Sequence, residues 1–462
     1  MLDVEKPIKG CKTAIRSEKI IKDILDHLAP LNRNLVSDEF EESLCYLRKY
    51  IDLKMHCYKT GSQCWTWDIP PKWRIKNGYI RKDGKEIASI KQHPLQVMSY
   101  STPVHEKMKG SELLKHIYEH PILADAIPYE FSFYKRRWGF CLTRAQRNLI
   151  QEEEMYDVCI DSEFIDDYLS VGEYTVPGTS DEHIFFLCHI DHPCQVNDSL
   201  TGVAVNVALA KRLESKKGYY NYTFLFVPET IGSIAYLSHN ENLISKIRYA
   251  IFDEMIGLEK PLILQKSYRE DALINAYALY VIKKRQGESR GYPFLSVASN
   301  DEKVFDGPGI GVPSISITRV DQERRLQKNQ EYKSQGKHAV EPPYPEYHSH
   351  LDNLKLISYQ NVNATVDCLF DLVNVLESDF IPIRKFKGPV FLSKFDLWID
   401  WRTDWEMNEK MIWLMYSLEG EMTAFQIAEK LNIDFEKVVA ILSRFYEKGL
   451  IEKRQIEIGF DR

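Results

Sequence analysis

The chain has 462 residues, about three times the length of a typical ~150-residue domain, so two or three folding units are expected. Hydrophobic residues make up 44% of the chain and charged residues 27%, which is typical of a globular protein and excludes a disordered one. Sixty basic against 67 acidic side chains leave a net charge of −7, the opposite sign from most proteins that bind nucleic-acid phosphates or anionic lipid.

Residues 17–55 have the pattern of helices, with apolar side chains at helical spacing and Ser37 as an N-cap candidate. Between residues 64 and 104 the pattern changes to short aromatic segments interrupted by turn residues. Asp83-Gly84 lies there between two strand-like segments and predicts a β-hairpin. We therefore expect a small β-rich unit in this part of the chain.

From about residue 130 to residue 380, apolar strand-like segments alternate with helical ones. We predict strands at 183–188, 222–227, 249–252 and 314–317, and helices at 201–213 and 233–243. Strictly alternating strands and helices favour an α/β fold, with a mostly parallel sheet and helices on both faces. In such sheets ligands bind at the carboxyl ends of the strands.

The last seventy or so residues have a different character. Helices are expected at 410–418, from Thr423 and from Asp434, followed by a turn at Gly449 and a strand-like segment, which is the sequence pattern of a winged helix. Residues 421–462 carry seven basic and eight acidic side chains, whereas DNA-binding modules of this type are clearly basic. A packing or dimerisation module is therefore favoured over DNA binding.

Acids and histidines follow the predicted strands of the central region. They are His189, Asp191, His192 and Asp198 after the first strand, Glu229 after the second, Asp253 and Glu254 after the third, and His348 further on. Taken singly, each has an ordinary explanation, such as a structural hydrogen bond or a helix N-cap. Their recurrence after successive strands instead favours a site for one or two zinc ions, because zinc takes nitrogen and carboxylate ligands.

The order of these residues resembles a known clan of enzymes. His-x-Asp at 189–191, Asn-Asp-x-x-x-Gly at 197–202, Glu229 before Gly-Ser, an acid before Met-Ile-Gly and Tyr-His-Ser-x-x-Asp at 347–352 resemble the di-zinc aminopeptidases and glutaminyl cyclases. Nearly the whole chain, including Trp67-Asp68-Ile69-Pro70, resembles a cytoplasmic bacterial branch of that clan. Members of this branch have a C-terminal winged helix and often occur beside polysaccharide-biosynthesis genes.

The resemblance implies a role for several of these residues. Asp198 corresponds to the ligand that bridges two ions, His348 to the last histidine ligand, and Glu254 to the carboxylate ligand of the second ion. Asp301 and Glu302 lie in a loop that the clan places beside the substrate. Arg319, at a strand end, would suit a clamp for a substrate carboxylate or phosphate, with a surface ion pair as the alternative.

Two assignments stay open. The clan has a Glu-Glu pair that supplies a base and a ligand, but this chain has only Glu229, which we favour as the general base over a ligand. His189 fits the His-x-Asp pattern with Asp191 as its orienting carboxylate, whereas the closer branch keeps the histidine at His192. We retain both histidines as ligands and prefer His192.

These observations predict a zinc-dependent hydrolase whose activated water attacks an amide of a peptide or of an aminoacyl or acylamino small molecule. The alternative is a non-catalytic metal-binding scaffold or regulator that acts through the winged helix. We expect an aminopeptidase-like domain at 1–60 and 129–385, an inserted β-rich domain at 61–128 and a winged-helix domain at 386–462. A homo-oligomer remains an open alternative to a monomer, and DNA a disfavoured partner.

The sequence also predicts where the protein resides. No window approaches the ~18 consecutive apolar residues of a membrane span, and residues 1–7 contain acidic side chains and no apolar core, unlike a signal peptide. The nine cysteines include no Cys-x-x-Cys pair, which argues against a disulfide framework. We therefore expect a cytoplasmic protein with reduced thiols and no membrane partner.

Overall fold

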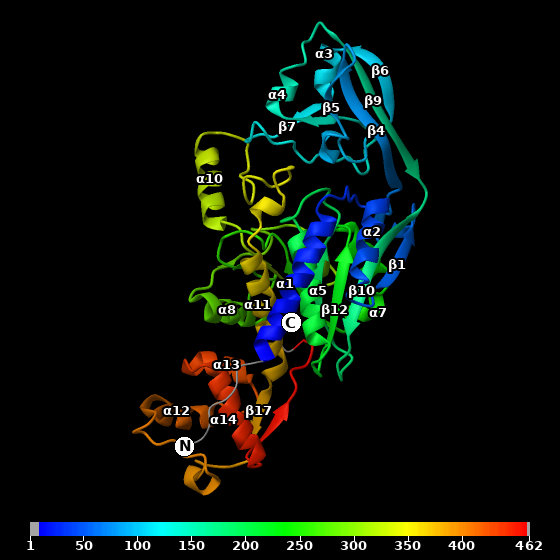
Figure 1. Ribbon diagram of the computed structural model, residues 1–462. Coiled ribbons are helices and arrows are strands. Elements are labelled where there is room, and N and C mark those ends of the chain that lie inside the picture. The colour runs from blue at the N-terminus through cyan, green and yellow to red at the C-terminus, as the bar shows by residue number, and fades with distance from the viewer. Residues whose placement is uncertain (1–8, 460–462) are drawn as a thin grey trace. The chain divides into compact units, whose positions relative to one another are not determined.

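The computed structural model describes residues 9–459, with side chains from residue 17 onward (Figure 1). Residues 1–7, which do not resemble a signal peptide, and the ends of the first and last predicted domains lie outside the described residues. The chain divides into two compact units, Met1–Phe370 and Asp371–Arg462. None of the described helices is both long enough and apolar enough to cross a membrane.

An eight-stranded mixed sheet forms the centre of the first unit, in the order β1-β10-β12-β11-β13-β16-β14-β15. Its four middle strands run parallel: β12 (Asn221–Val227), β11 (His183–His189), β13 (Ile247–Asp253) and β16 (Ser314–Thr318). Antiparallel pairing joins β1 to β10, β10 to β12 and β14 to β16, while β15 pairs parallel with β14. The bounds of these outer strands are β1 (Lys54–Lys59), β10 (Tyr168–Val176), β14 (Ile263–Gln265) and β15 (Gly291–Tyr292).

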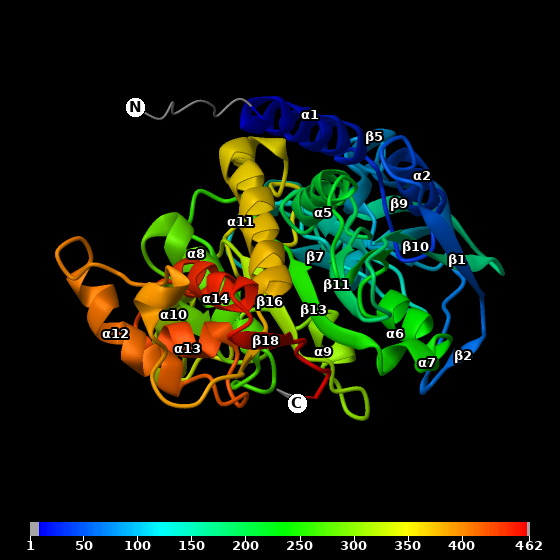
Figure 2. The same cartoon turned by 90° about the horizontal axis from the view of Figure 1, so that it is seen from below.

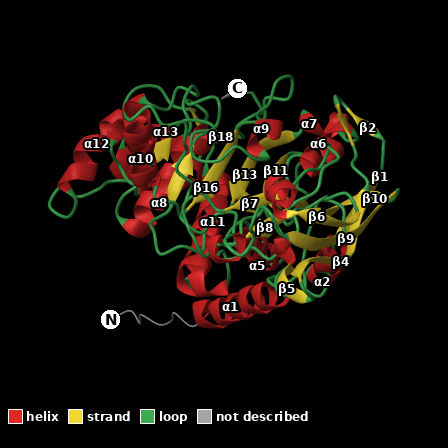
Figure 3. Ribbon diagram, turned by 90° about the horizontal axis from the view of Figure 1, so that it is seen from above, coloured by secondary structure: helices red, strands yellow, loops and turns green. Residues whose placement is uncertain are grey.

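Helices cover both faces of this sheet, which confirms the predicted α/β fold. Helices α1 (Lys9–Leu28), α5 (Leu200–Leu213) and α11 (Tyr359–Ser378) lie on one side, and α6 (Ile231–Ser238), α7 (Glu241–Ile244) and α9 (Glu302–Phe305) on the other, as Figure 2 and Figure 3 show. The middle strands are buried almost throughout, which explains why their sequences are continuously apolar. Further helices of this unit are α2 (Asp38–Leu47), α8 (Leu273–Gln286), α10 (Gln322–Ser334) and the 3₁₀ turn η3 (Leu354–Leu356).

A second, antiparallel sheet has the order β5-β4-β9-β6. The predicted hairpin is present, because Lys82 pairs with Lys85 across a turn in which Asp83 and Gly84 have φ values of 49° and 78°. The sheet contains β4 (Lys72–Lys82), β5 (Lys85–Ser89), β6 (Val104–Lys109) and β9 (Met155–Ile165). Strand β9 lies beyond residue 128, where we expected the inserted domain to end, and the division into three domains stays a prediction.

Short elements complete the β-rich region: β2 (Gln63–Cys64), β3 (Trp67–Asp68), η1 (Pro94–Gln96), α3 (Gly110–Leu113), η2 (Leu114–His116), β7 (Ile117–Glu119), β8 (Phe140–Leu142) and α4 (Arg144–Arg147).

Two predicted helices end earlier than their sequence patterns suggest. The helical region expected to reach residue 55 stops at Leu47, after which the chain enters β1 at Lys54. The helix expected at 233–243 is interrupted after Ser238, where the Asn240 side chain donates a hydrogen bond to Tyr236 O at 2.7 Å. A side chain that takes a helical carbonyl in this way competes with continuation of the helix.

After the end of α11, the described residues of the second unit form three α-helices, a 3₁₀ turn and a two-stranded antiparallel sheet. Its elements are β17 (Ile381–Arg384), η4 (Leu392–Phe395), α12 (Trp405–Tyr416), α13 (Ala424–Leu431), α14 (Phe435–Glu447) and β18 (Ile451–Arg454). Thr423 forms a capping box with Gln426, and Asp434 accepts hydrogen bonds from Glu436 N and Lys437 N, so both predicted helix starts are observed. Whether the unit acts as a winged helix stays a prediction.

Candidate metal centre

Three adjacent parallel strands bring the predicted site residues together. In the order β12-β11-β13, β11 ends at His189, Glu229 comes two residues after β12, and β13 ends at Asp253, immediately before Glu254. The carboxyl ends of parallel strands meet at one edge of the sheet, so side chains that are distant in sequence become neighbours there.

Asp198 lies at the centre of this cluster. Its Oδ1 is 3.1 Å from His189 Nε2, and its Oδ2 is 3.0 Å from His192 Nδ1 and 3.3 Å from His348 Nε2. The two oxygens of one buried carboxylate thus face different imidazoles. On the Oδ1 side, His189 Nδ1 is also 3.9 Å from Glu254 Oε2.

Glu229 joins the cluster through His192, whose Nε2 is 3.1 Å from Glu229 Oε2. The backbone N–H of Glu229 donates to Asp191 Oδ1 at 2.8 Å. Asp191, which we expected to orient His189, therefore fixes the backbone at Glu229. The Glu229 side chain retains 26% of its exposure and that of His348 28%, so these two groups offer the cluster a route to solvent.

The histidines and carboxylates stabilise one another's charged forms. Burial and the neighbouring His192 lower the pKa of His189, but Asp198 outweighs them and raises it to about 9. Burial raises the pKa of Glu229, but His192 and His189 outweigh it and bring that pKa to about 2. An imidazole proton of this cluster thus lies between a ring nitrogen and a carboxylate oxygen. A metal cation bound by the same two atoms would replace that proton.

His189 compensates the charge of Glu254 only in part. Burial and the nearby Glu302 carboxylate raise the pKa of Glu254 well above its ordinary value. Within the described residues, Glu254 Oε1 is buried without a hydrogen-bond partner, although Asn300 Nδ2 donates to Oε2. A buried carboxylate crowded by a second one is expensive unless a positive charge is near.

Asp352 holds the backbone at Asp198, just before the N-terminus of α5, in place. The Asp352 carboxylate accepts hydrogen bonds from the backbone N–H groups of Asn197 at 2.7 Å and Asp198 at 3.1 Å, and from the Tyr344 hydroxyl at 2.8 Å. Gly202, the glycine of the Asn-Asp-x-x-x-Gly motif, packs so closely that an added Cβ would lie 1.9 Å from Asp253 O. This motif therefore combines a polar anchor with a close helix–strand contact.

Arg33 supports the loop that carries His192, a role that no sequence pattern indicates. Its buried guanidinium donates to Ile190 O at 2.7 Å, His192 O at 2.6 Å and Gln195 O at 2.8 Å. Burial lowers the pKa of Arg33 to about 10, which leaves it charged at neutral pH. A residue more than 150 positions away in sequence therefore fixes this loop.

Three non-glycine residues at the cluster have positive φ values: Thr230 (φ 63°), Met255 (φ 51°) and His348 (φ 52°). Two of them directly follow Glu229 and Glu254, and the third carries a cluster imidazole. Such conformations are uncommon, most of all for β-branched threonine, and they concentrate at functional sites. The Thr230 N–H donates to Asp301 Oδ1 at 2.8 Å, a contact that supports the strained turn.

Aromatic rings enclose His348. Tyr347 stacks on its imidazole with the ring centroids 3.9 Å apart, and Tyr129 lies 5.3 Å from His348 and 5.4 Å from His192. Tyr129 N also donates to His348 O at 2.7 Å. Tyr129, which no sequence pattern singled out, thus forms part of the site.

The three residues predicted to contact substrate have different surroundings. Asp301 is buried beside the Glu229 turn, and burial raises its pKa to about 7. Glu302 is also buried; its Oε1 accepts from Gln265 Nε2 at 3.0 Å. Arg319 donates to Lys260 O at 2.6 Å and Asn361 O at 3.3 Å, which are contacts with the protein's own backbone and not those of the predicted clamp.

The six residues predicted as base or ligands form three overlapping groups whose donor atoms lie within 4.8 Å of one another. These are His189, Asp198 and Glu254; His192, Asp198 and His348; and His189, His192 and Glu229. Zinc prefers imidazole nitrogens and carboxylate oxygens as donors, and this cluster holds both kinds close together. Among the described residues, one of these oxygens, Glu254 Oε1, is buried without a hydrogen-bond partner and is available to a metal. The residues therefore fit a divalent metal of the zinc type.

The chain matches a described family and a relative that it covers nearly end to end. The profile of a family described as a domain of unknown function, DUF4910, matches residues 22–379. A Clostridium acetobutylicum protein, whose name refers to polysaccharide biosynthesis and an aminopeptidase-like domain, is 29% identical over 438 residues, covering 94% of this chain and 96% of that one.

Solved structures show the same architecture. A crystal structure titled as a peptidase from Clostridium acetobutylicum superposes with a TM-score of 0.81 at 27% identity, covering 96% of this chain and 97% of that one. The zinc aminopeptidase BSAP from Bacillus subtilis gives a TM-score of 0.56 at 14% identity, with 81% and 96% coverage. The resemblance to aminopeptidases found in the sequence is thus confirmed at the level of the fold.

Proposed function

The chain belongs to the family described as a domain of unknown function (DUF4910), and we propose that it is a zinc-dependent hydrolase acting on an amide bond. Its substrate would be a peptide or a small molecule that carries an aminoacyl or acylamino group. The aminopeptidase-like fold and the peptidase title of its 27%-identical structural relative support the reaction class. The polysaccharide-biosynthesis name of its sequence relative is compatible with an acylamino substrate.

The observation that carries the proposal is the arrangement around Asp198. One of its oxygens faces His189, which in turn lies 3.9 Å from Glu254, and the other oxygen faces His192 and His348. A carboxylate flanked in this way suits a bridging position between two ions. We therefore assign His189 to one ion and His192, together with His348, to the other, which gives both His189 and His192 a ligand role.

Zinc bound by these residues would polarise the amide carbonyl and lower the pKa of water towards ~7. Glu229 suits the part of proton acceptor, because it is a carboxylate at the edge of the cluster and part of its side chain reaches solvent. The Asp191 carboxylate positions Glu229 by accepting the backbone N–H of Glu229, and His192 Nε2 orients the Glu229 carboxylate. Asp352 and Arg33 hold the loops that carry Asp198 and His192.

Zinc content and turnover test the two halves of this proposal separately. Metal analysis of the purified protein should find one or two zinc ions per chain, with at least one lost in Asp198→Ala and in His348→Ala. His105→Ala, which removes an exposed histidine of β6, is the matched control and should keep the full content. Zinc retained at the wild-type level by both cluster variants would refute the site.

Turnover of a panel of aminoacyl and acylamino amides tests the base. Glu229→Gln should keep most of the zinc and lose at least ~100-fold in kcat, as expected for a general base. Undiminished turnover in this variant would refute the assignment of Glu229. Loss of all zinc would instead make Glu229 a ligand.

A further inference from the structure

Helix α12 of the second unit has two apolar faces. Met407, Met411 and Leu414 are buried and pack into the unit. At 100° per residue, Trp405, Ile412, Trp413 and Tyr416 fall on the opposite side of the helix. One face accounts for the packing of the unit, so the other needs a separate explanation.

This second face is aromatic and exposed. With Trp401, whose ring centroid is 6.1 Å from that of Trp405, it forms what we term the aromatic face, whose exposed fractions are Trp401 53%, Trp405 63%, Trp413 59% and Tyr416 68%. Single exposed aromatic side chains are ordinary, but four on one helix and its entry turn are not. At ~150–250 Å² for each ring, the exposed part amounts to roughly 500 Å².

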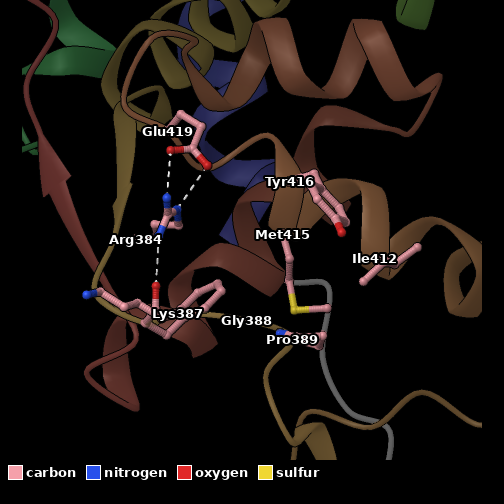
Figure 4. Close-up of a pocket in the computed structure, with 9 residues that line it drawn as sticks. Arg384, Lys387, Gly388, Pro389, Ile412, Met415, Tyr416 and Glu419 are labelled. Atoms are coloured by element: carbon pink, nitrogen blue, oxygen red, sulfur yellow. Dashed lines mark hydrogen bonds and ion pairs between the residues drawn. The ribbon is translucent and has the colours of Figure 1, made fainter.

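A pocket adjoins the aromatic face at Tyr416, which is one of the lining residues that Figure 4 shows. Its volume is about 400 Å³, and Ile412, Met415 and Tyr416 of α12 line it together with Phe386 and Pro389. At its rim, Arg384 forms a two-pronged ion pair with Glu419, with N–O distances of 2.9 and 3.0 Å. An apolar pocket beside exposed rings can accept a ring from a partner, which is the usual anchor of a protein interface.

The charges of this region argue for a protein partner. Residues 384–419, which include the pocket and the aromatic face, contain six acidic and six basic side chains. Nucleic-acid or anionic-lipid surfaces call for a clear basic excess. A protein surface requires mainly apolar area, and a standard interface buries ~800 Å² on each partner, of which the aromatic face supplies more than half.

We propose that the aromatic face is the contact through which two copies of this chain form a symmetric dimer. In a two-fold contact each copy presents the same patch, so a ring of one copy meets the pocket of the other. The exposed rings lie on α12 and the turn before it, and three residues of α12 line the pocket. One copy therefore carries both parts of the contact. This inference is independent of the metal chemistry proposed above.

Sedimentation of the full-length protein at concentrations from roughly 1 to 100 µM tests the proposed dimer. This range suits dissociation constants in the micromolar region. The wild type should sediment at twice the chain mass at the upper end. Trp413→Ser and, independently, Trp405→Arg should each weaken dimerisation by at least ~10-fold, the loss expected when an interface anchor is removed. Since both side chains are exposed, their thermal unfolding should match that of the wild type.

Tyr446→Ser is the matched control, because Tyr446 is 51% exposed on α14, outside the aromatic face. It should dimerise as the wild type does. A wild type that is monomeric throughout, dimers unaffected by both tryptophan variants, or equal weakening by the Tyr446 control would each overturn the proposal.

Discussion

The carboxylate of Asp352 accepts the backbone N–H of Asp198 at 3.1 Å, so one acid of the Tyr-His-Ser-x-x-Asp motif positions the central acid of the cluster. Asp352→Asn keeps the shape but replaces one acceptor oxygen by a donor that faces N–H groups. We expect zinc affinity to fall by ~10–100-fold, as for other residues that orient ligands. The stability should fall by about 1–3 kcal/mol, the cost of buried donors left without acceptors.

Zinc affinity in this variant is measured by competition with a chelating dye, and stability by urea unfolding. Tyr344→Phe removes only one of the donors to Asp352 and serves as the control. Its zinc affinity should change less than that of Asp352→Asn. Wild-type affinity in Asp352→Asn would show that Asp352 does not position the site.

A second prediction concerns Gly202 at the start of α5. In Gly202→Ala the new methyl group would meet a backbone oxygen of β13, so helix or strand must shift. We expect a loss of about 1–3 kcal/mol, typical of overpacking, together with weaker zinc binding. Gly291→Ala is the control, because its Cβ would lie 3.1 Å from the flexible end of Lys266. Equal urea midpoints for the two variants would contradict the close-packing argument.

Local sequence was sufficient for the elements that build the site. The continuously apolar strands and the polar residues that follow them are adjacent in the chain, so β11, β12 and β13, and then His189, Glu229 and Glu254, could be predicted from short segments. Topology did the rest, because parallel order brings strand ends to one edge. The assignment of metal and base roles to these residues stays a prediction.

Contacts between distant segments could not be predicted in this way. Arg33 lies in a loop without periodicity, and its partners in the His192 loop are 157 to 162 positions further along. The choice between His189 and His192 depended on which oxygen of Asp198 each one faces, a matter of loop conformation. Arg319 was expected at the substrate because it ends a strand, but its guanidinium satisfies two backbone carbonyls.

A third prediction concerns Lys72, a buried lysine of β4. Its ammonium lies 2.7 Å from Asp167, 2.9 Å from Asp38 and 3.3 Å from Glu41, which links β4 to α2 and to the β9–β10 turn. Removing one partner of a buried pair is costly, but these carboxylates are partly exposed and can be rehydrated. We therefore expect Lys72→Met to lose about 1–3 kcal/mol at pH 7.

This loss should depend on pH. Hydrogen bonding to Arg74, opposed by burial and aided by Lys72, lowers the pKa of Asp38 to about 2. Its unfolded value is near ~3.9, so its stabilisation is present above that pH and disappears as the pH falls towards 2. Urea unfolding at pH 7 and pH 2.5 should show the Lys72→Met defect shrinking, whereas Lys76→Met, on the exposed side of β4, should change little at either pH. A defect that does not shrink at acid pH would contradict the ion-pair explanation.

The last prediction is that the metal stabilises the folded protein. Glu254 and Glu302 repel each other in the buried cluster, and a divalent cation would relieve that repulsion. A ligand that binds only the native state at ~1,000 times its Kd adds roughly 4 kcal/mol, so removing zinc with a chelator should lower the Tm by roughly 5–10 °C. Scanning calorimetry with and without chelator measures the shift, and re-added zinc should reverse it.

Two variants serve as controls for this shift in Tm. Asp198→Ala should show no shift, whereas Lys72→Met, which is destabilised at a different place, should keep it. An identical Tm with and without chelator in the zinc-loaded wild type would contradict a stabilising metal at this site.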